Sequence, residues 1–495
     1  MKIFEDIKNN SNFTSIFKVI ITGCFGYIIG KGIVNAKYEY IIIPIISLIV
    51  FIPLIILFLI CYFLVQFAPL PILKIFSAGP VDIYIWDVFL IVITVKLLMK
   101  AYLNKKELYS TPVNANIVVF FLWGLICTLY GYYRFGEEHF VFTFVSYLRT
   151  ISLVSLFFFA SNVINSKKDI EIFVKAVLLI LMFQSLLGIV QRSGSVFGFN
   201  ILFTIFSPNK GALEGIDFRS VGTMGNPNNY GQTLVLFSFA VIVNLLKTKN
   251  NVKSILLVLF VFVGIILSGS KSAYLASLVL VFTVIYQKSK DRFKNIVIFI
   301  SLLIAVVYFF QNYVSHRIFS EFTVFDVDNN TIDIMQTSST MRRSDIWITK
   351  LKLLYESPIF GLGWFGDLKV HSGEQYGFGT YSHNQYIGTL VNVGVPGLFL
   401  FIILHYRILY LAWNLRNITN DIFMKNISIA CFSALLAFYV TMIFNSPLET
   451  GTTPSAIFWA MAGFVMSLNR IAKREKLEND KLLLEGKDEK YKYST

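Results

Sequence analysis

Apolar and polar positions follow one another along this chain in long blocks. Apolar runs of about 20 residues, the length that crosses a bilayer as an α-helix, recur from near the N-terminus to residue 470. Clusters of charge, glycine, proline or asparagine separate the runs, and these residues favour helix ends and turns. The runs cover residues 13–34, 40–66, 82–101, 113–131, 145–165, 170–191, 229–246, 253–268, 272–287, 295–312, 385–411, 426–445 and 454–470.

This pattern predicts an all-α, polytopic integral membrane protein with about 12–13 transmembrane helices. Strand-length alternation of apolar and polar residues does not occur, which excludes an outer-membrane barrel. Glycines interrupt the first run and Pro44 and Pro53 the second, so either could lie in the membrane interface or be re-entrant. Composition agrees, because 15% of the residues are charged and a soluble domain carries about 25%.

The formal net charge of +14 would suggest nucleic-acid binding in a soluble protein. From the third run onward, however, most lysines and arginines gather in every second connection. The positive-inside rule makes that side cytoplasmic, and segments 192–228 and 313–383 are then external. The excess charge is therefore an orientation signal, and we expect no nucleic-acid partner.

Three parts follow from this pattern: an N-terminal tail at 1–12, a transmembrane domain at 13–470, and a charged cytoplasmic tail at 471–495. The 313–383 connection is far longer than usual connections, and its spacing of apolar residues predicts short amphipathic helices. Only 192–228 and 313–383 are long enough to build a site outside the bilayer, so any chemistry is expected there.

Arg219 is the first candidate residue, and it lies just before a predicted helix start at Asn226-Pro227. Asparagine at an N-cap followed by proline at the first helical position is a common helix start. Glycine, asparagine and arginine beside the positive end of a helix could also hold an anion. We therefore include Asn226 and Asn228 as supporting residues.

Arg343 is the second candidate, in the segment Arg342-Arg343-Ser344-Asp345-Ile346-Trp347. Arg343 lies one helical turn before Trp347 and shares its face. An amphipathic helix on the bilayer explains the apolar positions, and Arg342 with Asp345 could be an ordinary ion pair. The same helix could aim Arg343 at the membrane surface, where a lipid diphosphate would lie.

His383 is the third candidate, and it precedes Asn384 at the start of the next apolar run. A lone histidine is more often packed or solvated, but a helix N-terminus disfavours its protonation and keeps the imidazole available as a base. Arg149, near the predicted external end of its helix, is placed for a cavity and is a further supporting candidate.

The sequence lacks the motifs of several other kinds of site. The Asp326–Asn330 segment has neither the glycine nor the glutamate of a calcium loop. Zinc, phosphate-loop and serine-nucleophile motifs are also missing. The cysteines lie in apolar runs without close spacing, at Cys24, Cys61, Cys127 and Cys431. We predict no metal site and no disulfide framework.

Taken in order, these motifs resemble the O-antigen ligase and polymerase superfamily of bacterial membrane glycosyltransferases. The resemblance covers roughly residues 180–415. Its motifs are Arg219 with Gly225-Asn226-Pro227-Asn228, the Ser268-Gly269-Ser270 turn, Arg343 before Trp347, Pro358 with Gly361 and Gly363, and His383-Asn384 with Gly394 and Gly397.

The resemblance implies a bacterial cell-membrane enzyme with an external catalytic face. It would transfer a glycan from an undecaprenyl-diphosphate carrier, in an inverting reaction, without a metal, nucleotide sugar or other cofactor. Arg219 and Arg343 would contact the diphosphate, and His383 would be the general base, with Arg342 and Asn384 nearby. Lys271 stands where the family often has arginine; lysine keeps the charge but loses the planar fork.

Three functions remain open. The first is a polymerase that joins lipid-linked repeat units of a surface polysaccharide, such as O-antigen, capsule or exopolysaccharide, together with other assembly proteins. The second is a ligase that hands a finished glycan to a lipid-core or protein acceptor. The third is a transporter or flippase, although transporters usually place charges near the membrane midplane and show repeated halves.

Overall fold

A computed structural model gives the fold over most of the chain. It describes residues 52–67, 74–78, 81–104, 108–196, 219–247, 252–288, 301, 339–369, 382–448 and 453–492. The predicted run at 13–34, the start of the run at 40–66 and nearly all of the run at 295–312 lie outside these ranges.

The described residues form an all-α fold with one small addition, a β-hairpin. The helices are α4 (Leu54–Leu64), α5 (Ile85–Asn104), α6 (Asn114–Phe135), α7 (Glu137–Val163), α8 (Lys167–Val196), α10 (Pro227–Lys247), α11 (Val252–Leu267), α12 (Lys271–Lys288), α15 (Ser339–Leu354), α16 (Gln385–Ile418), α17 (Ile422–Thr441) and α18 (Thr453–Lys492). Short 3-10 turns, η1 (Val65–Phe67) and η5 (Gly366–Leu368), follow α4 and precede α16.

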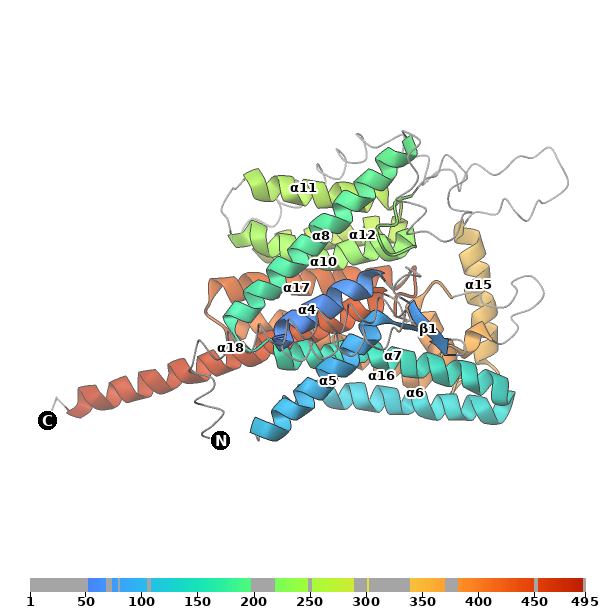
Figure 1. The fold of residues 1–495 in the computed structure, drawn as a ribbon, viewed down its shortest axis with the longest axis horizontal. Helices are drawn as coiled ribbons and strands as arrows, with labels where there is room; N and C mark the ends of the chain where they lie inside the picture. Colours follow the sequence, from blue (N-terminus) through green and yellow to red (C-terminus); the bar gives the residue numbers. More distant parts are fainter. Residues whose placement is uncertain are drawn as a thin grey trace, which may run out of the picture.

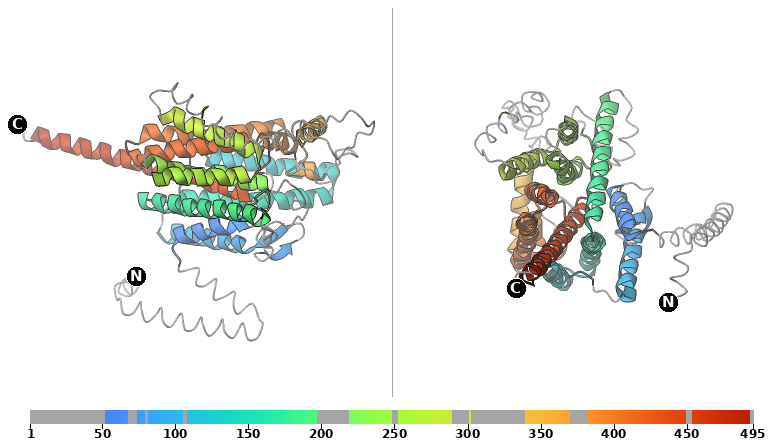
Figure 2. Two further views of the ribbon diagram at one scale, coloured as in Figure 1. Left: turned by 90° about the horizontal axis from the view of Figure 1, so that it is seen from above. Right: turned by 90° about the vertical axis from the view of Figure 1, so that its left-hand side faces the viewer.

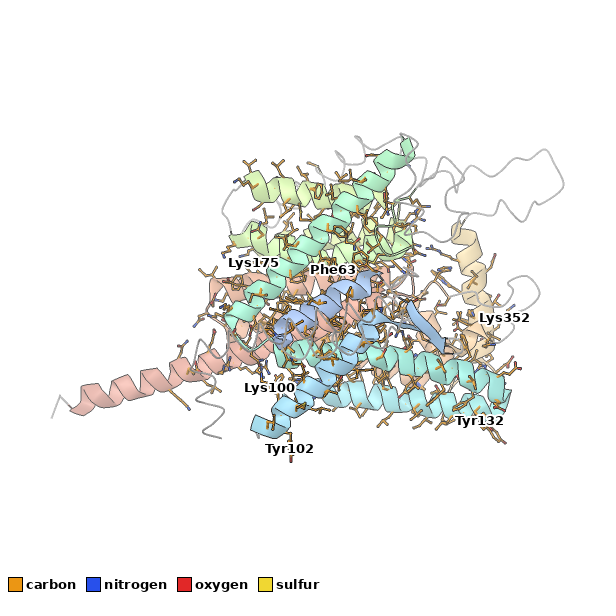
Figure 3. All side chains as sticks on the ribbon, viewed as in Figure 1. Phe63, Lys100, Tyr102, Tyr132, Lys175 and Lys352 are labelled. Carbon is orange, nitrogen blue, oxygen red and sulfur yellow. The ribbon has the colours of Figure 1, made fainter. Side chains whose placement is uncertain are left out.

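The predicted membrane character is confirmed. Seven of these helices are long and apolar enough to cross a bilayer, namely α6, α7, α8, α10, α16, α17 and α18. Two shorter apolar helices, Leu54–Phe67 and Val252–Leu267, accompany them. The exposed tyrosines Tyr102 on α5 and Tyr132 on α6 lie toward opposite ends of the bundle (Figure 3), as tyrosines at two membrane interfaces would.

Two local features differ from the predicted runs. Strands β1 (Lys74–Ala78) and β2 (Val81–Tyr84) pair antiparallel; β1 lies between two predicted runs, and β2 takes the first residues of the run predicted as a helix at 82–101. Helix α7 begins at Glu137, before the predicted start at 145. Two acidic residues, Glu137 and Glu138, occupy its first turn, where the helix dipole favours negative charge, so the helix includes polar residues that a hydropathy window excludes.

Helix α10 lies at the centre of the bundle. Every residue from Tyr230 to Val243 is buried, and α10 packs against α8, α11, α12, α17 and α18. The view along the bundle in Figure 2 shows these helices side by side. Helix α18 is largely buried as far as Ala472 and then continues beyond the bundle as a charged extension (Figure 1).

Helix α15 differs from the rest because it stands across one end of the bundle (Figure 1). This is the amphipathic helix predicted within 313–383. Its buried side chains Ile346, Lys350 and Leu353 face the protein, whereas Ile348 and Tyr355 are exposed. We call the end of the bundle at α15 the site end, and the end where α8 and α17 begin the opposite end.

Candidate functional site

Arg219 is fixed against the turn between α11 and α12. Its Nε donates to the Ser268 carbonyl at 2.9 Å, and its Nη2 donates to Asn228 Oδ1 at 2.8 Å. The next backbone N–H, that of Ser220, donates to the Leu267 carbonyl at 2.9 Å. The structure thus brings together Arg219, Asn228 and the 268–271 turn, which lie up to about 50 residues apart in the sequence.

Gly269 makes this close approach sterically feasible. Its φ is +59°, and a Cβ atom there would lie 2.9 Å from Arg219 Nε. Any other L-residue would therefore be strained and would also press on the arginine. Lys271, two residues further on, is the first residue of α12 and is partly exposed, so it starts its helix beside the Arg219 segment.

The start of α10 confirms the predicted cap. The helix begins at Pro227, and Asn226 Oδ1 accepts from the backbone N–H groups of Asn228, at 2.8 Å, and Asn229, at 3.4 Å. Asn226 therefore has a structural task at the helix end. Asn228 has a different one, because its side-chain oxygen holds Arg219.

A short turn after α17, residues 442–448, joins the other parts of the site. Asn445 Nδ2 donates to Ser272 Oγ on α12 at 2.6 Å. On its other side, the carbonyls of Met442 and Asn445 accept from the Gln385 backbone N–H at 2.8 and 3.1 Å. This turn therefore links the Lys271 side of the site to the start of α16.

Arg343 reaches the same turn from α15. Its Nη1 donates to the Phe444 carbonyl at 3.2 Å. One helical turn later, Trp347 Nε1 donates to the Ser382 carbonyl at 2.8 Å. The predicted shared face of Arg343 and Trp347 is thus confirmed, and it faces the 442–448 turn and the start of α16.

Lys350 completes this face of α15 with a buried ion pair. Its Nζ lies 3.1 Å from Asp367 Oδ2, and the two side chains are 2% and 1% exposed. Lys350 Nζ also donates to the Asp367 carbonyl, while the Asp367 N–H donates to Asn392 Oδ1 on α16 at 2.9 Å. Buried charges require such partners, so this pair fixes α15 on the turn that precedes α16.

His383 lies between two residues that the fold holds tightly. Ser382 Oγ contacts Ser446 Oγ at 2.9 Å, and Asn384 caps α16 by accepting from Tyr386 and Ile387 N–H at 2.9 and 3.0 Å. His383 itself is partly exposed and has φ +50°. Left-handed backbone at a residue other than glycine is uncommon and often occurs at functional sites.

Helix α16 is broken at Gly394, which has φ +69°. Pro396 follows and has no N–H to donate, so carbonyls before the break need other donors. The carbonyls of Val391, Asn392 and Val393 accept from Leu362 N at 3.0 Å, Gly363 N at 2.9 Å and Trp123 Nε1 at 2.8 Å.

The turn at 357–368 therefore fills the break in α16. The N–H of Val395 donates in return to the Pro358 carbonyl at 2.9 Å, and Gly361 has φ +64°, with the Asn392 backbone 2.5 Å from where its Cβ would be. In a bilayer, an interrupted helix is tolerated where protein groups satisfy its backbone. This contact gives a physical reason for the proline and glycine motifs of 358–363 and 394–397.

The remaining predicted site residues lie elsewhere. Arg149 Nη1 forms an ion pair with Asp87 Oδ1 at 2.6 Å, and its guanidinium lies 4.0 Å from the centre of the Trp86 ring. The described contacts do not connect it to the Arg219 segment, and its supporting role stays a prediction. The side chain of Arg342 lies outside the described residues.

Sequence reasoning missed the 442–448 turn and the Lys350–Asp367 pair. The polar residues Asn445-Ser446-Pro447 at the end of an apolar run predict a turn, and they are the signal that could have pointed to this part of the site. Lys350 and Asp367 gave no signal, because the pairing of two charged residues on different elements, α15 and η5, cannot be read from their spacing in the sequence.

The site end holds Arg219 and Arg343 together with the segments that carry Lys271 and His383. Guanidinium groups bind phosphate oxygens through charge-assisted bonds, and an imidazole beside a helix N-terminus can accept a proton. Within the described ranges, no three His, Cys, Asp or Glu side chains cluster as a metal site would require.

Comparison with known families adds an independent finding. Residues 256–402 match the family model described as O-antigen ligase. This range includes Lys271, Arg343 and His383, and it begins after Arg219. Comparison with curated proteins gives no match. Residues 256–402 are therefore similar to the O-antigen ligase family, and this match together with the apolar helices is consistent with a multi-pass membrane protein of the O-antigen ligase and polymerase superfamily.

Proposed function

We propose that this protein is a polysaccharide polymerase that joins glycan repeat units carried on undecaprenyl diphosphate. The domain match supports a glycosyltransferase of the O-antigen ligase and polymerase type, with glycan and lipid-linked substrates. The observation that carries the proposal is the single hydrogen-bonded set around residues 442–448, which joins the segments of Arg343, His383 and Lys271.

The reaction follows from these side chains. An acceptor sugar hydroxyl attacks the anomeric carbon of the donor glycan, and the bond from that carbon to the diphosphate oxygen breaks with inversion. His383 takes the hydroxyl proton, a contribution of about 10²–10⁴-fold for general bases. Arg219 and Arg343 stabilise the negative charge that develops on the departing undecaprenyl diphosphate. No metal or cofactor has a step in this scheme.

The proposed setting is the bacterial cytoplasmic membrane with the site on the external face. Basic residues gather at the opposite end of the bundle, and the positive-inside rule places that end, with the C-terminus, in the cytoplasm. Lipid-linked donor, growing glycan and other assembly proteins would then meet at the site end. Accessibility labelling of single cysteines at the two ends would test this orientation.

The decisive assay supplies purified protein in liposomes with undecaprenyl-diphosphate-linked repeat units, with and without a distinct lipid-core acceptor. A polymerase gives a ladder of lengthened lipid-linked glycans without the added acceptor. Product only when the acceptor is added would instead identify a ligase. Movement of the donor across the bilayer without a new glycosidic bond would identify a transporter and overturn the proposal.

His383→Asn is the sharpest variant for the proposed base. Asparagine tolerates a left-handed backbone better than alanine, so the φ of +50° at this position is retained while the proton acceptor is lost. We expect polymer formation to fall about 10²–10⁴-fold with an unchanged melting temperature. Near-full activity of this variant would remove His383 from the mechanism.

A further inference from the structure

Two glutamines on the apolar helix α8 hold the segment that carries Arg219. Gln191 is 2% exposed, and its Oε1 accepts from the backbone N–H groups of Val221 at 3.1 Å and Gly222 at 2.9 Å. Its Nε2 donates to the Gly222 carbonyl at 2.8 Å. One side chain therefore makes three bonds to two consecutive residues of the loop.

Gln184 repeats this contact two helical turns earlier on the same face of α8. It is fully buried, and its Oε1 accepts from the Thr223 N–H at 3.2 Å. Its Nε2 donates to Thr223 Oγ1 at 2.7 Å and to Gln66 Oε1 at 3.2 Å. Thr223 Oγ1 in turn donates to the Gln66 carbonyl at 2.7 Å, so η1, α8 and the loop share one buried network.

The loop geometry fits these contacts closely. Gly222 has φ +54°, and a Cβ there would lie 2.6 Å from Gln184 Oε1. Ser220 Oγ donates to the Gly188 carbonyl of α8 at 2.7 Å. Buried amides are costly unless they are hydrogen-bonded, and residues 220–223 supply most of the partners of Gln191 and Gln184.

We infer that Gln191 and Gln184 are positioning residues for Arg219. They fix residues 221–223 from the α8 side, and Ser220 connects this fixed backbone to Arg219, whose guanidinium lies on the Ser268 carbonyl and Asn228. The glutamines do not touch the substrate; they set where the guanidinium is presented. This inference rests on the proposed role of Arg219 in binding the diphosphate.

The first experiment compares kinetics of the full-length protein in liposomes. Gln191→Leu removes all three bonds to the loop, and we expect kcat/KM for lipid-linked donor to fall about 10- to 100-fold. Gln191→Glu, neutral in this buried position, keeps the acceptor for the two N–H groups and supplies an O–H donor to the Gly222 carbonyl, so it should recover most of this loss. Gln287→Leu is the matched control, because Gln287 Nε2 bridges α12 to Ser433 Oγ at 3.1 Å at the opposite end; its activity should stay within twofold.

The second experiment separates positioning from general damage. If Gln191 acts through Arg219, then Gln191→Leu should lower activity in the wild-type background but cause no further loss in an Arg219→Ala background. Equal fold losses in both backgrounds would overturn the inference. Gly222→Ala, which shifts the loop without changing α8, should show the same dependence on Arg219 and serves if Gln191→Leu does not fold.

The third experiment measures the accessibility of the 220–223 loop and does not depend on an enzymatic product. Val221 is 1% exposed, so Val221→Cys should resist maleimide labelling, measured against the parent protein with its native cysteines. Adding Gln191→Leu should raise the labelling rate at least tenfold, and adding Gln287→Leu should not. Unchanged labelling would contradict the positioning role, whereas released labelling with no polymerase activity in any variant would contradict the proposed function alone.

Discussion

The two candidate diphosphate-binding arginines of the site end are held in a different way from the charged residues of the opposite end. At the opposite end, Lys167 bridges two carboxylates, Asp421 at 2.5 Å and Glu475 at 3.1 Å, and so ties α8 to α17 and α18. At the site end, Arg219 and Arg343 donate to backbone carbonyls and an amide oxygen. The first arrangement joins helices to one another, whereas the second holds guanidinium groups on loops.

This contrast shows why an arginine near a helix end is not by itself a site. Arg470, at the opposite end, also donates to a carbonyl, that of Ile164 at 2.7 Å, but its ring contact with Tyr109 and its bond to Asn165 keep it within helix packing. At the site end, in contrast, α12, α15 and the start of α16 all contact the 442–448 turn, and Arg219 lies on the turn that leads into α12. If this contrast is correct, substitutions of residues in helix packing should change stability, and substitutions of the candidate ligand arginines should change catalysis.

The largest expected effect is on stability, at the Lys350–Asp367 pair. Lys350→Met leaves a carboxylate buried without its ionic partner, which typically costs about 3–5 kcal/mol. We expect the melting temperature in detergent to fall sharply. The matched double variant Lys350→Met with Asp367→Leu should regain most of the stability, because it removes both charges; if it is no more stable than the single variant, the pair is not the cause.

The next largest effect should be on catalysis, at Arg219. Removing a donor that stabilises developing negative charge costs about 10²–10³-fold in rate, and we expect this for Arg219→Ala with little change in melting temperature. Arg219→Lys should recover only part of the activity, since lysine lacks the fork that bonds Ser268 and Asn228 together. Arg470→Lys is the control from the opposite end, and a comparable loss of turnover there would erase the contrast between the ends.

The smallest effect should come from Asp421, which caps α17 and pairs with Lys167. Burial alone would raise the pKa of Asp421, but the Lys167 ammonium and the N–H groups of Phe423 and Met424 hold the pKa below its ordinary value. Asp421→Asn keeps the cap and loses the partly exposed ion pair, at a cost below about 1 kcal/mol, while Asp421→Ala also loses the cap, about 1 kcal/mol more.

The lowered pKa of Asp421 also makes the stability that it contributes depend on pH. A depressed carboxylate pKa contributes stability above the pKa of the unfolded chain, near pH 4, and the contribution disappears as pH falls through the lower folded value. Melting temperatures of wild type and Asp421→Asn should therefore differ at neutral pH and converge in acid. A difference that grows on acidification would contradict the assigned partner.

The sequence predicted the helices better than the site. Apolar runs located the seven candidate spans between α6 and α18, because hydropathy depends only on local composition. The cap at Asn226 was also predicted, since a cap is a contact within four residues. In contrast, the Lys350–Asp367 pair and the 442–448 turn depend on side chains brought together by folding, and neither leaves a spacing signal.

The site residues fall between these cases. Arg219, Arg343 and His383 stood out because each lies in a predicted external segment, beside a predicted helix start or on a predicted amphipathic helix. Their order matched a family, but nothing in the sequence could show that Gln191, inside an apolar run, holds the Arg219 loop. A polar residue in such a run has a partner that only the three-dimensional arrangement reveals.

The break in α16 also bears on how the protein is made. The carbonyls exposed at Val391 and Asn392 take their donors from Leu362 and Gly363, which lie earlier in the chain and are synthesised first. The ribosome therefore releases the 357–368 turn before it releases the interrupted helix α16. The turn can supply its N–H donors as soon as α16 enters the membrane. Replacing residues 357–368 with an unrelated loop should therefore lower the yield of membrane-inserted protein.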